Sequence, residues 1–149
     1  MIVQSQSLVA DRSDAVIGGK AEGLVRLLKA GVSVPNFFVL PPGEAPEEAV
    51  EAYVAAGWGR VAIRSSAVGE DGVEHSFAGM YETVLGVEGE ASLLAAIQTC
   101  RDSANSERLR AYRAAHGLEA RPVAVVVQEL VEGTSSGVLF SRDPSDPDH

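Results

Sequence analysis

A run of apolar and mostly β-branched residues, PVAVVVQELV at 122–131, most constrains what this chain can fold into. Branched side chains pack well on a pleated surface, so a continuous apolar run of this length predicts a strand. Two shorter runs, FFVL at 37–40 and RVAIRSS at 60–66, predict buried strands for the same reason. The chain is therefore expected to be built around a sheet.

Between these runs the spacing of apolar residues changes to that of amphipathic helices. Leu93, Leu94, Ile97 and Cys100 recur at helical spacing and predict one apolar helix face. Strands and helices alternate without a regular βαβ period, so we expect an α+β domain with a mixed sheet. The predicted helices cover 18–31, 45–57, 90–104 and 106–117, and further strands are predicted at 2–10, 80–87 and 136–144.

Length and charge limit the classes of protein to consider. The chain has 149 residues, enough for one domain spanning 1–149, and its formal net charge is −9. This charge argues against nonspecific binding to nucleic acid or to an anionic membrane. No apolar run reaches the roughly 20 residues that span a bilayer, and the N-terminus lacks the pattern of a signal peptide. The single cysteine, Cys100, is expected in the core, and a cytoplasmic protein is the expectation.

The segment IGGK places two glycines and a lysine where a helix is predicted to begin. Gly18 and Gly19 would let the backbone come close to a ligand, and the first N–H groups of a helix attract anions. Lys20 adds a positive charge, although the spacing is not that of a Walker loop. A Gly-Gly turn followed by a solvated lysine is the alternative that this segment leaves open.

Arg64 stands at the end of an apolar strand and is followed by a long polar loop. A guanidinium group can bind phosphate oxygens bidentately. Beyond the loop, Gly79 would let a backbone N–H approach a phosphate, and Thr83 offers a hydroxyl group. The alternative is that Arg64 pairs with Glu70 or Asp71 and only holds the loop.

The apolar run at 122–131 ends in polar residues, Gln128 and Glu129, followed by Leu130 and Val131. Where a strand runs out of sheet partners, its backbone can form hydrogen bonds with an adenine while aliphatic side chains cover the ring. An ordinary exit from a strand into a turn remains the alternative.

Four segments in order, IGGKAEGL, VAIRSSAVGEDGVEHSFAGMYETVLGV, VAVVVQELV and SGVLFSRDP, resemble the N-terminal ATP-binding domain of the phosphoenolpyruvate synthase and pyruvate phosphate dikinase family. Rifampicin phosphotransferase shares this domain. The resemblance covers most of the chain, and its RSSA, ED and SFAG elements are highly specific. It implies an ATP-grasp fold that holds ATP between two lobes. The phosphoryl group would then pass to a histidine on a separate domain, and from there to pyruvate or another small acceptor.

The resemblance also implies roles for individual residues. Lys20 matches the lysine of the glycine loop, and Arg64 matches the phosphate-binding arginine. Cations and close-approaching backbone suit a triphosphate, whose transfer depends on positioning and charge neutralisation. The residues expected to bind ATP are Lys20, Arg64, the phosphate-covering Gly79 and Thr83, and Gln128, Glu129 and Val131 near the adenine.

The chain also departs from the family pattern. Ala21, Glu22 and Gly23 replace the usual residues after the lysine, and the interval from Lys20 to Arg64 is short. The family's metal-binding acidic residues and its phosphohistidine motif have no counterpart by position. We therefore expect one lobe of an ATP-grasp domain, with no catalytic or metal-binding residue of its own. Mg²⁺, the second lobe and a phosphohistidine domain would complete the enzyme, and self-association through the uncovered face is a further expectation.

Two other classes of protein remain open from the sequence. One is a stand-alone nucleotide-binding or regulatory module, which would bind ATP without turnover. The other is a structural domain in which Lys20 and Arg64 pair with nearby carboxylates, which would not bind ATP at all.

Overall fold

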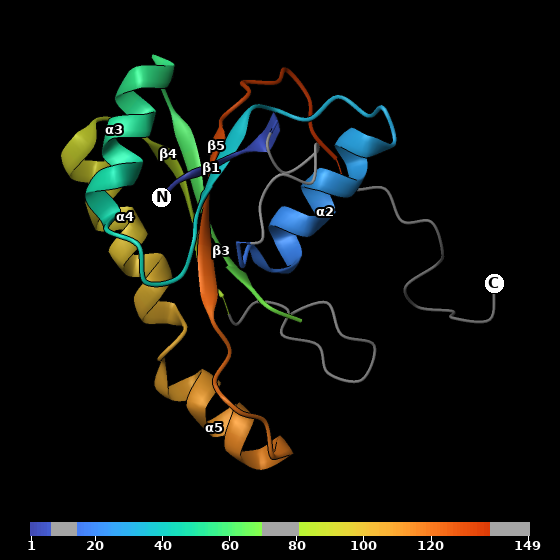
Figure 1. The fold of residues 1–149 in the computed structure, drawn as a ribbon, viewed down its shortest axis with the longest axis vertical. Helices are drawn as coiled ribbons and strands as arrows, with labels where there is room; N and C mark the ends of the chain where they lie inside the picture. Colours follow the sequence, from blue (N-terminus) through green and yellow to red (C-terminus); the bar gives the residue numbers. More distant parts are fainter. Residues whose placement is uncertain (7–14, 70–80, 138–149) are drawn as a thin grey trace.

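The computed structural model describes residues 1–6, 15–69 and 81–137 of the chain. Its elements form three layers, with a sheet between helices on both faces (Figure 1). Helices α3 (Pro46–Ala56) and α4 (Glu90–Ser103) cover one face, and α2 (Gly18–Lys29) lies against the other. Helix α5 (Glu107–His116) extends beyond the end of the sheet.

The sheet has five strands in the order β1-β2-β5-β3-β4, and all four pairings are antiparallel. The longest pairing joins β3 and β5 in the middle of the sheet, from Val61 opposite Glu129 to Ala67 opposite Val123. The apolar run at 122–131 therefore contributes the central strand β5. The prediction of an α+β fold is confirmed. The strands are β1 (Val3–Gln4), β2 (Phe37–Leu40), β3 (Val61–Ala67), β4 (Thr83–Val87) and β5 (Val123–Glu129).

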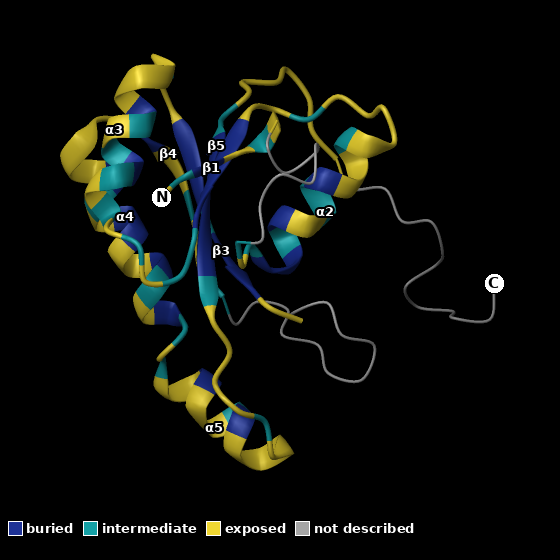
Figure 2. Cartoon of the chain, in the orientation of Figure 1, coloured by how far each residue is buried: buried dark blue, intermediate teal, exposed yellow. Residues whose placement is uncertain are grey.

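Two apolar cores lie on the two faces of the sheet, which explains why the central strands are apolar throughout. Successive residues of a strand point to opposite faces. Val125 and Val127 accordingly pack under α3 and α4, whereas Ala124 and Val126 pack under α2. Figure 2 shows the buried strands between helices whose outer sides are exposed. The predicted face of α4 is confirmed, since Leu93, Ile97 and Cys100 are fully buried, with Leu94 half-buried.

The helix ends follow local chemistry. The Ser106 hydroxyl accepts a hydrogen bond from the Leu109 backbone N–H at 3.3 Å, which caps the start of α5. Gly117 ends this helix in the left-handed conformation, with φ of 64°. Pro46 opens α3, and acidic residues in its first turn complement the helix dipole. None of the helices in the described part of the chain combines the length and apolarity needed to cross a bilayer.

The strand predicted at 2–10 is shorter in the structure, because β1 pairs with β2 only through Val3 and Gln4. The strand ends at Gln4 because the next two residues, Ser5 and Gln6, are helical. Residues 7–10 of the predicted strand lie outside the described residues. The same holds for most of the strand predicted at 136–144, of which only 136 and 137 are described, and these two are not in a strand.

Arg64 is not at the end of its strand, which corrects the sequence interpretation. β3 continues through Ser65 and Ser66 to Ala67, paired residue by residue with β5. The two serines are fully buried. Both hydroxyls have hydrogen-bond partners, so these polar residues continue the strand and do not start a loop.

Candidate functional site

Three of the predicted ATP-binding residues share one face of the sheet. Arg64 lies directly opposite Thr83 of β4, and residues that face each other across an antiparallel pair point the same way. Gln128 lies opposite Ala62, two residues before Arg64, and therefore points to this face as well. It is the face covered in part by α2, which carries Lys20. The fold thus collects residues that are up to 108 positions apart, the interval from Lys20 to Gln128.

Arg64 and Gln128 contact each other across the central pair of strands. An Nη1 N–H of Arg64 donates to the Gln128 side-chain oxygen at 3.4 Å, near the upper limit for a hydrogen bond. Gln128 is buried and donates through its amide nitrogen to the Pro35 carbonyl oxygen, also at 3.4 Å. Among the described residues Arg64 has no carboxylate partner, and Glu70 and Asp71 lie outside them. The hydrogen bond of Arg64 to Gln128 uses one of the five donors of the guanidinium group, which is half-buried.

Lys20 reaches back from the first turn of α2 to β3. Its ammonium donates to the Ser65 carbonyl oxygen at 2.9 Å and lies 5.7 Å from the centre of the Tyr81 ring. A cation at that distance from an aromatic face is stabilised by the ring quadrupole. Lys20 is therefore held beside β3 and the start of β4, and the solvated lysine of the alternative interpretation is wrong.

The first glycine of IGGK, Gly18, packs against the central strand β3. Gly18 has φ of 74°, and a Cβ atom at this position would lie 2.7 Å from the Ser66 hydroxyl and closer still to the Ser66 carbonyl group. The Ser66 hydroxyl also accepts a hydrogen bond from the Ala21 backbone N–H at 3.2 Å. Gly18 thus lets the start of α2 approach β3. This contact places Lys20, two residues further along α2, beside β3.

The segment that leads into β4 is fixed by buried polar contacts. The Glu82 carbonyl oxygen accepts from the Ser65 hydroxyl at 2.7 Å and from the Ser65 backbone N–H at 3.1 Å. The Cys100 thiol lies 3.6 Å from the same carbonyl oxygen, and burial raises its pKa to about 11. Cys100 is thus a neutral core thiol. Sequence reasoning missed Ser65 and Ser66 as residues that organise the site, although two serines inside an apolar strand were the available signal.

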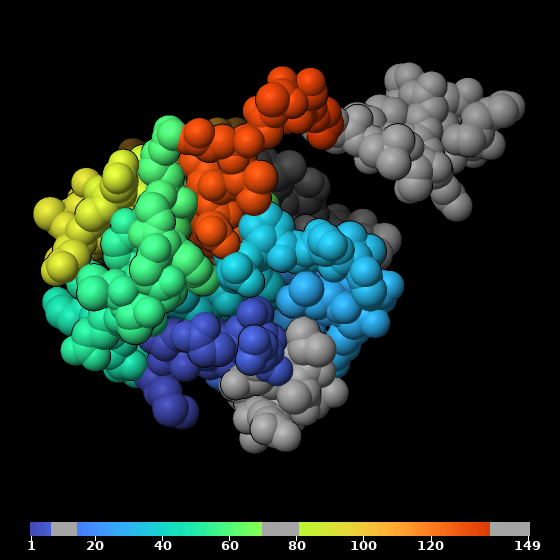
Figure 3. Space-filling model, turned by 90° about the horizontal axis from the view of Figure 1, so that it is seen from above, coloured from blue at the N-terminus to red at the C-terminus, as the bar shows by residue number. Residues whose placement is uncertain are grey.

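The end of β5 presents part of the polar backbone that the adenine hypothesis requires. The Glu129 backbone N–H donates to the Asn36 carbonyl oxygen at 2.8 Å, and the Leu130 N–H donates to that of Arg60 at 3.0 Å. These two donors are therefore already used. Val131 is 66% exposed and its N–H has no hydrogen bond to another described residue. Seen from above, the segment after β5 lies at the surface between residues near the end of α3 and residues near the start of β2 (Figure 3).

Two further expectations concern Gly79 and a metal site. Gly79 lies outside the described residues, so its position stays a prediction. Within the described ranges no three His, Cys, Asp or Glu side chains gather as a metal site would require. Of the described residues expected to bind ATP, only Glu129 is a carboxylate, and it accepts a hydrogen bond from the Asn36 side chain at 3.0 Å. This set by itself does not supply the oxygen ligands of a magnesium ion.

Comparison with known proteins shows what the chain is similar to. Residues 42–149 match the family model described as pyruvate phosphate dikinase, AMP/ATP-binding domain. Prodigiosin synthesizing transferase PigC of Serratia marcescens is 31% identical over 163 residues, covering 86% of this chain and 18% of that protein. Phosphoenolpyruvate synthase of Aeropyrum pernix is 32% identical over 186 residues, covering 87% and 23%. Rifampicin phosphotransferase of Streptomyces sviceus is 46% identical over 85 residues, covering 56% and 10%. The chain spans less than a quarter of the length of each of these relatives.

Proposed function

The chain belongs to the pyruvate phosphate dikinase AMP/ATP-binding domain family, and we propose that it binds ATP on the α2 face of its sheet. The observation that carries this proposal is the shared orientation of Arg64, Thr83 and Gln128 next to Lys20. Two cations from separate elements meet there, and Arg64 lacks a carboxylate partner within the described ranges. Such a site favours a polyphosphate, whose negative charge it neutralises.

Each residue has a proposed role that follows from its place. Lys20 and Arg64 bind phosphate oxygens, and the Thr83 hydroxyl, which is exposed on the edge strand β4, adds a donor. Gln128 holds Arg64 toward the ligand through their mutual contact. The adenine would lie against the end of β5, where the Glu129 carbonyl and the Val131 N–H can form hydrogen bonds with its edge. Gly79 would cover the phosphates from the neighbouring loop.

The wider reaction is proposed from the family. The domain would supply the ATP-binding part of a dikinase-type phosphotransferase. A phosphoryl group would pass to a histidine of a further domain and then to pyruvate or another small acceptor. The relatives named for phosphoenolpyruvate synthesis and rifampicin phosphotransfer support phosphoryl transfer without fixing the acceptor for this chain. A second lobe that closes over the nucleotide is part of this proposal.

Titration calorimetry on the chain tests the nucleotide site. ATP and ADP should bind more tightly than adenosine, and binding should weaken as salt is added, because the contacts are charge-assisted. Arg64→Ala should weaken ATP binding by about tenfold or more, since one charge-assisted contact contributes about 1.5–3 kcal/mol.

Arg26→Ala provides the matched control. Arg26 is an exposed arginine on α2, the helix that carries Lys20, and its loss changes the net charge by the same amount. It should leave ATP affinity almost unchanged. Equal ATP affinity in the wild type and in Arg64→Ala would refute the phosphate site.

A further inference from the structure

A concavity lies on the side of the sheet opposite α2, at the end where β5 begins. It encloses about 350 Å³, at the small end of the range for ligand sites. Its floor includes Val123, which points to the same face as Val125 and therefore away from α2. We call this concavity the arginine groove. Its lining residues are Pro42, Gly43, Arg101, Ala104, Asn105, Arg113, Ala120, Arg121 and Val123.

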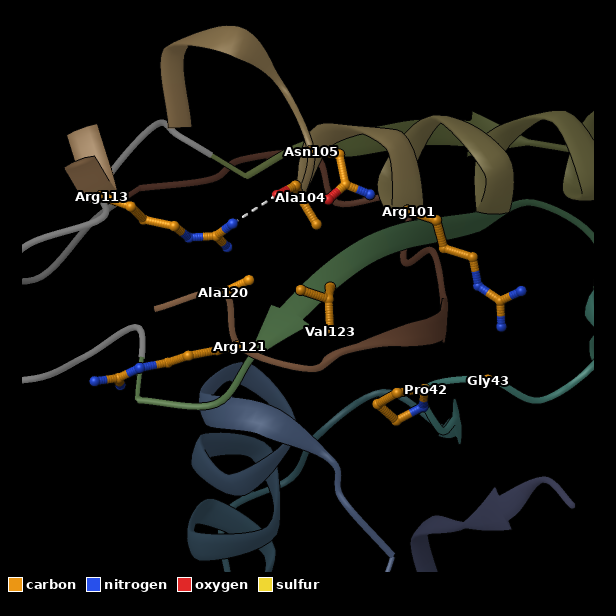
Figure 4. A pocket seen from close by; sticks show the side chains of 9 residues that line it. All are labelled: Pro42, Gly43, Arg101, Ala104, Asn105, Arg113, Ala120, Arg121 and Val123. Atoms are coloured by element: carbon orange, nitrogen blue, oxygen red, sulfur yellow. Dashed lines mark hydrogen bonds between the residues drawn. The ribbon is translucent and has the colours of Figure 1, made fainter. Parts of the chain in front are cut away.

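Three arginines from different elements border the arginine groove (Figure 4). Arg101 comes from the last turn of α4, Arg113 from α5, and Arg121 from the segment before β5. Arg101 lies at one end of the groove, and Arg113 and Arg121 lie at the other, with Ala104, Asn105, Ala120 and Val123 between them. The Arg113 guanidinium points into the groove, and those of Arg101 and Arg121 point outward. The fold thus brings positive charge to both ends of the groove.

The hydrogen bonds of these arginines go to neutral acceptors. Arg101 donates to the Glu44 backbone oxygen at 2.6 Å, and Arg121 donates to the Val68 backbone oxygen at 3.1 Å. Arg113 donates to the Ala104 backbone oxygen at 3.0 Å and to the Tyr81 hydroxyl at 3.4 Å. No carboxylate in the described part of the chain forms an ion pair with any of them.

Arg113 is buried without a carboxylate partner among residues 1–6, 15–69 and 81–137. This residue is only 7% exposed. A buried charge is costly unless an opposite charge or strong hydrogen bonds compensate it, and a guanidinium has five N–H donors. Two of these donors have acceptors among the described residues. An anion in the groove would supply both the countercharge and acceptors for the rest.

The local amino-acid composition also favours binding of an anion. The stretch from 101 to 121 holds five of the chain's 12 basic residues but only three of its 21 acidic ones. One of these three, Asp102, accepts a hydrogen bond from Gln98 one turn earlier in α4. A strongly acidic chain therefore has a locally basic end, and a concavity there concentrates anions.

We propose that the arginine groove binds a small polyvalent oxyanion of the diphosphate class, at a site separate from the proposed nucleotide site. Planar guanidinium groups recognise such oxyanions bidentately. The Arg113 guanidinium points into the groove, and Arg101 and Arg121 add positive charge at its two ends. A polyvalent anion gains more from this charge than a monovalent one. The two sites lie on opposite faces of the sheet, and Tyr81 lies next to both, since Lys20 is 5.7 Å from the centre of its ring and Arg113 donates to its hydroxyl at 3.4 Å. Variants of Arg64 therefore test the nucleotide site, and variants of Arg101 and Arg121 test the groove.

Inorganic pyrophosphate is the probe, titrated calorimetrically at constant ionic strength set with NaCl. Pyrophosphate should bind more tightly than monophosphate. Arg101→Gln and Arg121→Gln should each weaken pyrophosphate binding by about tenfold, the loss expected for one charge-assisted contact. Both positions are more exposed than Arg113, so these variants should fold. Arg108→Gln, on the exposed surface of α5 and outside the groove lining, is the control with the same charge change.

A spectroscopic readout assigns the site directly. The side-chain Nε–H resonance of Arg113 should shift on adding pyrophosphate, and this shift should persist in Arg64→Ala. Pyrophosphate binding that is unaffected by Arg101→Gln and Arg121→Gln but lost in Arg64→Ala would overturn the groove proposal and leave the nucleotide site standing. The absence of any pyrophosphate binding at matched ionic strength would overturn it as well.

Discussion

Gly18 is the position where a single methyl group should do most damage to this fold. It begins α2 with φ of 74° and lies against the backbone of Ser66 in β3. In Gly18→Ala the new Cβ would collide with the Ser66 carbonyl group, which is part of a central strand and cannot rotate away. The start of α2 would have to move, together with the Ala21 N–H bond to the Ser66 hydroxyl.

The expected cost follows from two contributions. A side chain in the left-handed region costs about 1–2 kcal/mol, and forcing an extra methyl group into a packed interior costs about 1–3 kcal/mol. The free energy of unfolding should therefore fall by about 2–5 kcal/mol, a large part of the 5–15 kcal/mol typical of a domain. Because α2 carries Lys20, ATP binding should weaken in the folded fraction as well.

Urea unfolding followed by circular dichroism measures this cost, with Gly23→Ala as the matched control. Gly23 lies inside the same helix, and a Cβ atom there would meet no other atom within 4 Å. Alanine favours helices over glycine by about 0.5–1 kcal/mol, so Gly23→Ala should stabilise the protein. If both variants changed the stability in the same direction and by similar amounts, close packing of Gly18 on Ser66 would not be the reason for the glycine.

Three further predictions concern single side chains. Cys100, with a pKa near 11, should have roughly one thiol in a thousand ionised at pH 8, so a thiol reagent should label it only as the protein unfolds; rapid labelling of the folded chain would contradict this. Arg64→Lys should weaken ATP binding, measured by calorimetry, nearly as much as Arg64→Ala, because an ammonium cannot reproduce the bidentate fork; retention of wild-type affinity would argue for a simple point charge. Ser66→Ala should lower the free energy of unfolding by about 1–3 kcal/mol by leaving the buried Ala21 N–H unpaired, whereas Thr99→Ala, which removes an exposed bond within α4, should change it by less than about 0.5 kcal/mol; equal effects in urea titrations would remove the buried hydrogen bond as the cause.

The positions of the main strands and helices could be predicted from the sequence, because they depend on local patterns. Three such local patterns are the apolar run of β5, the helical spacing in α4 and the glycine after α5. Each influences the backbone conformation of only a few neighbouring residues. For the candidate site, local patterns in the sequence could predict only which residue types take part, and not how they are arranged. Arg64, Lys20 and Gln128 stood out because cations and polar groups interrupt apolar segments.

The surroundings of Arg64 were decided by a neighbour far away in sequence. β3 continues past Arg64 as a paired central strand because β5 pairs with Ser65 and Ser66. Pairing energy is gained between strands, so the length of a strand depends on a partner that local propensity does not include. The sequence interpretation of Arg64 as a strand end was wrong for this reason.

The sequence by itself determined where buried strands and amphipathic helices form. It also determined which cations and glycines lie at their boundaries. Only the tertiary structure decided what these residues face. The β3–β4 and β3–β5 registers turn Arg64, Thr83 and Gln128 to one side, and the contact of Gly18 with Ser66 brings Lys20 to it. The arginine groove likewise exists only because three elements end near the start of β5. Side-chain direction in a sheet alternates with every residue, so function here depends on register, which is fixed by packing across the whole domain.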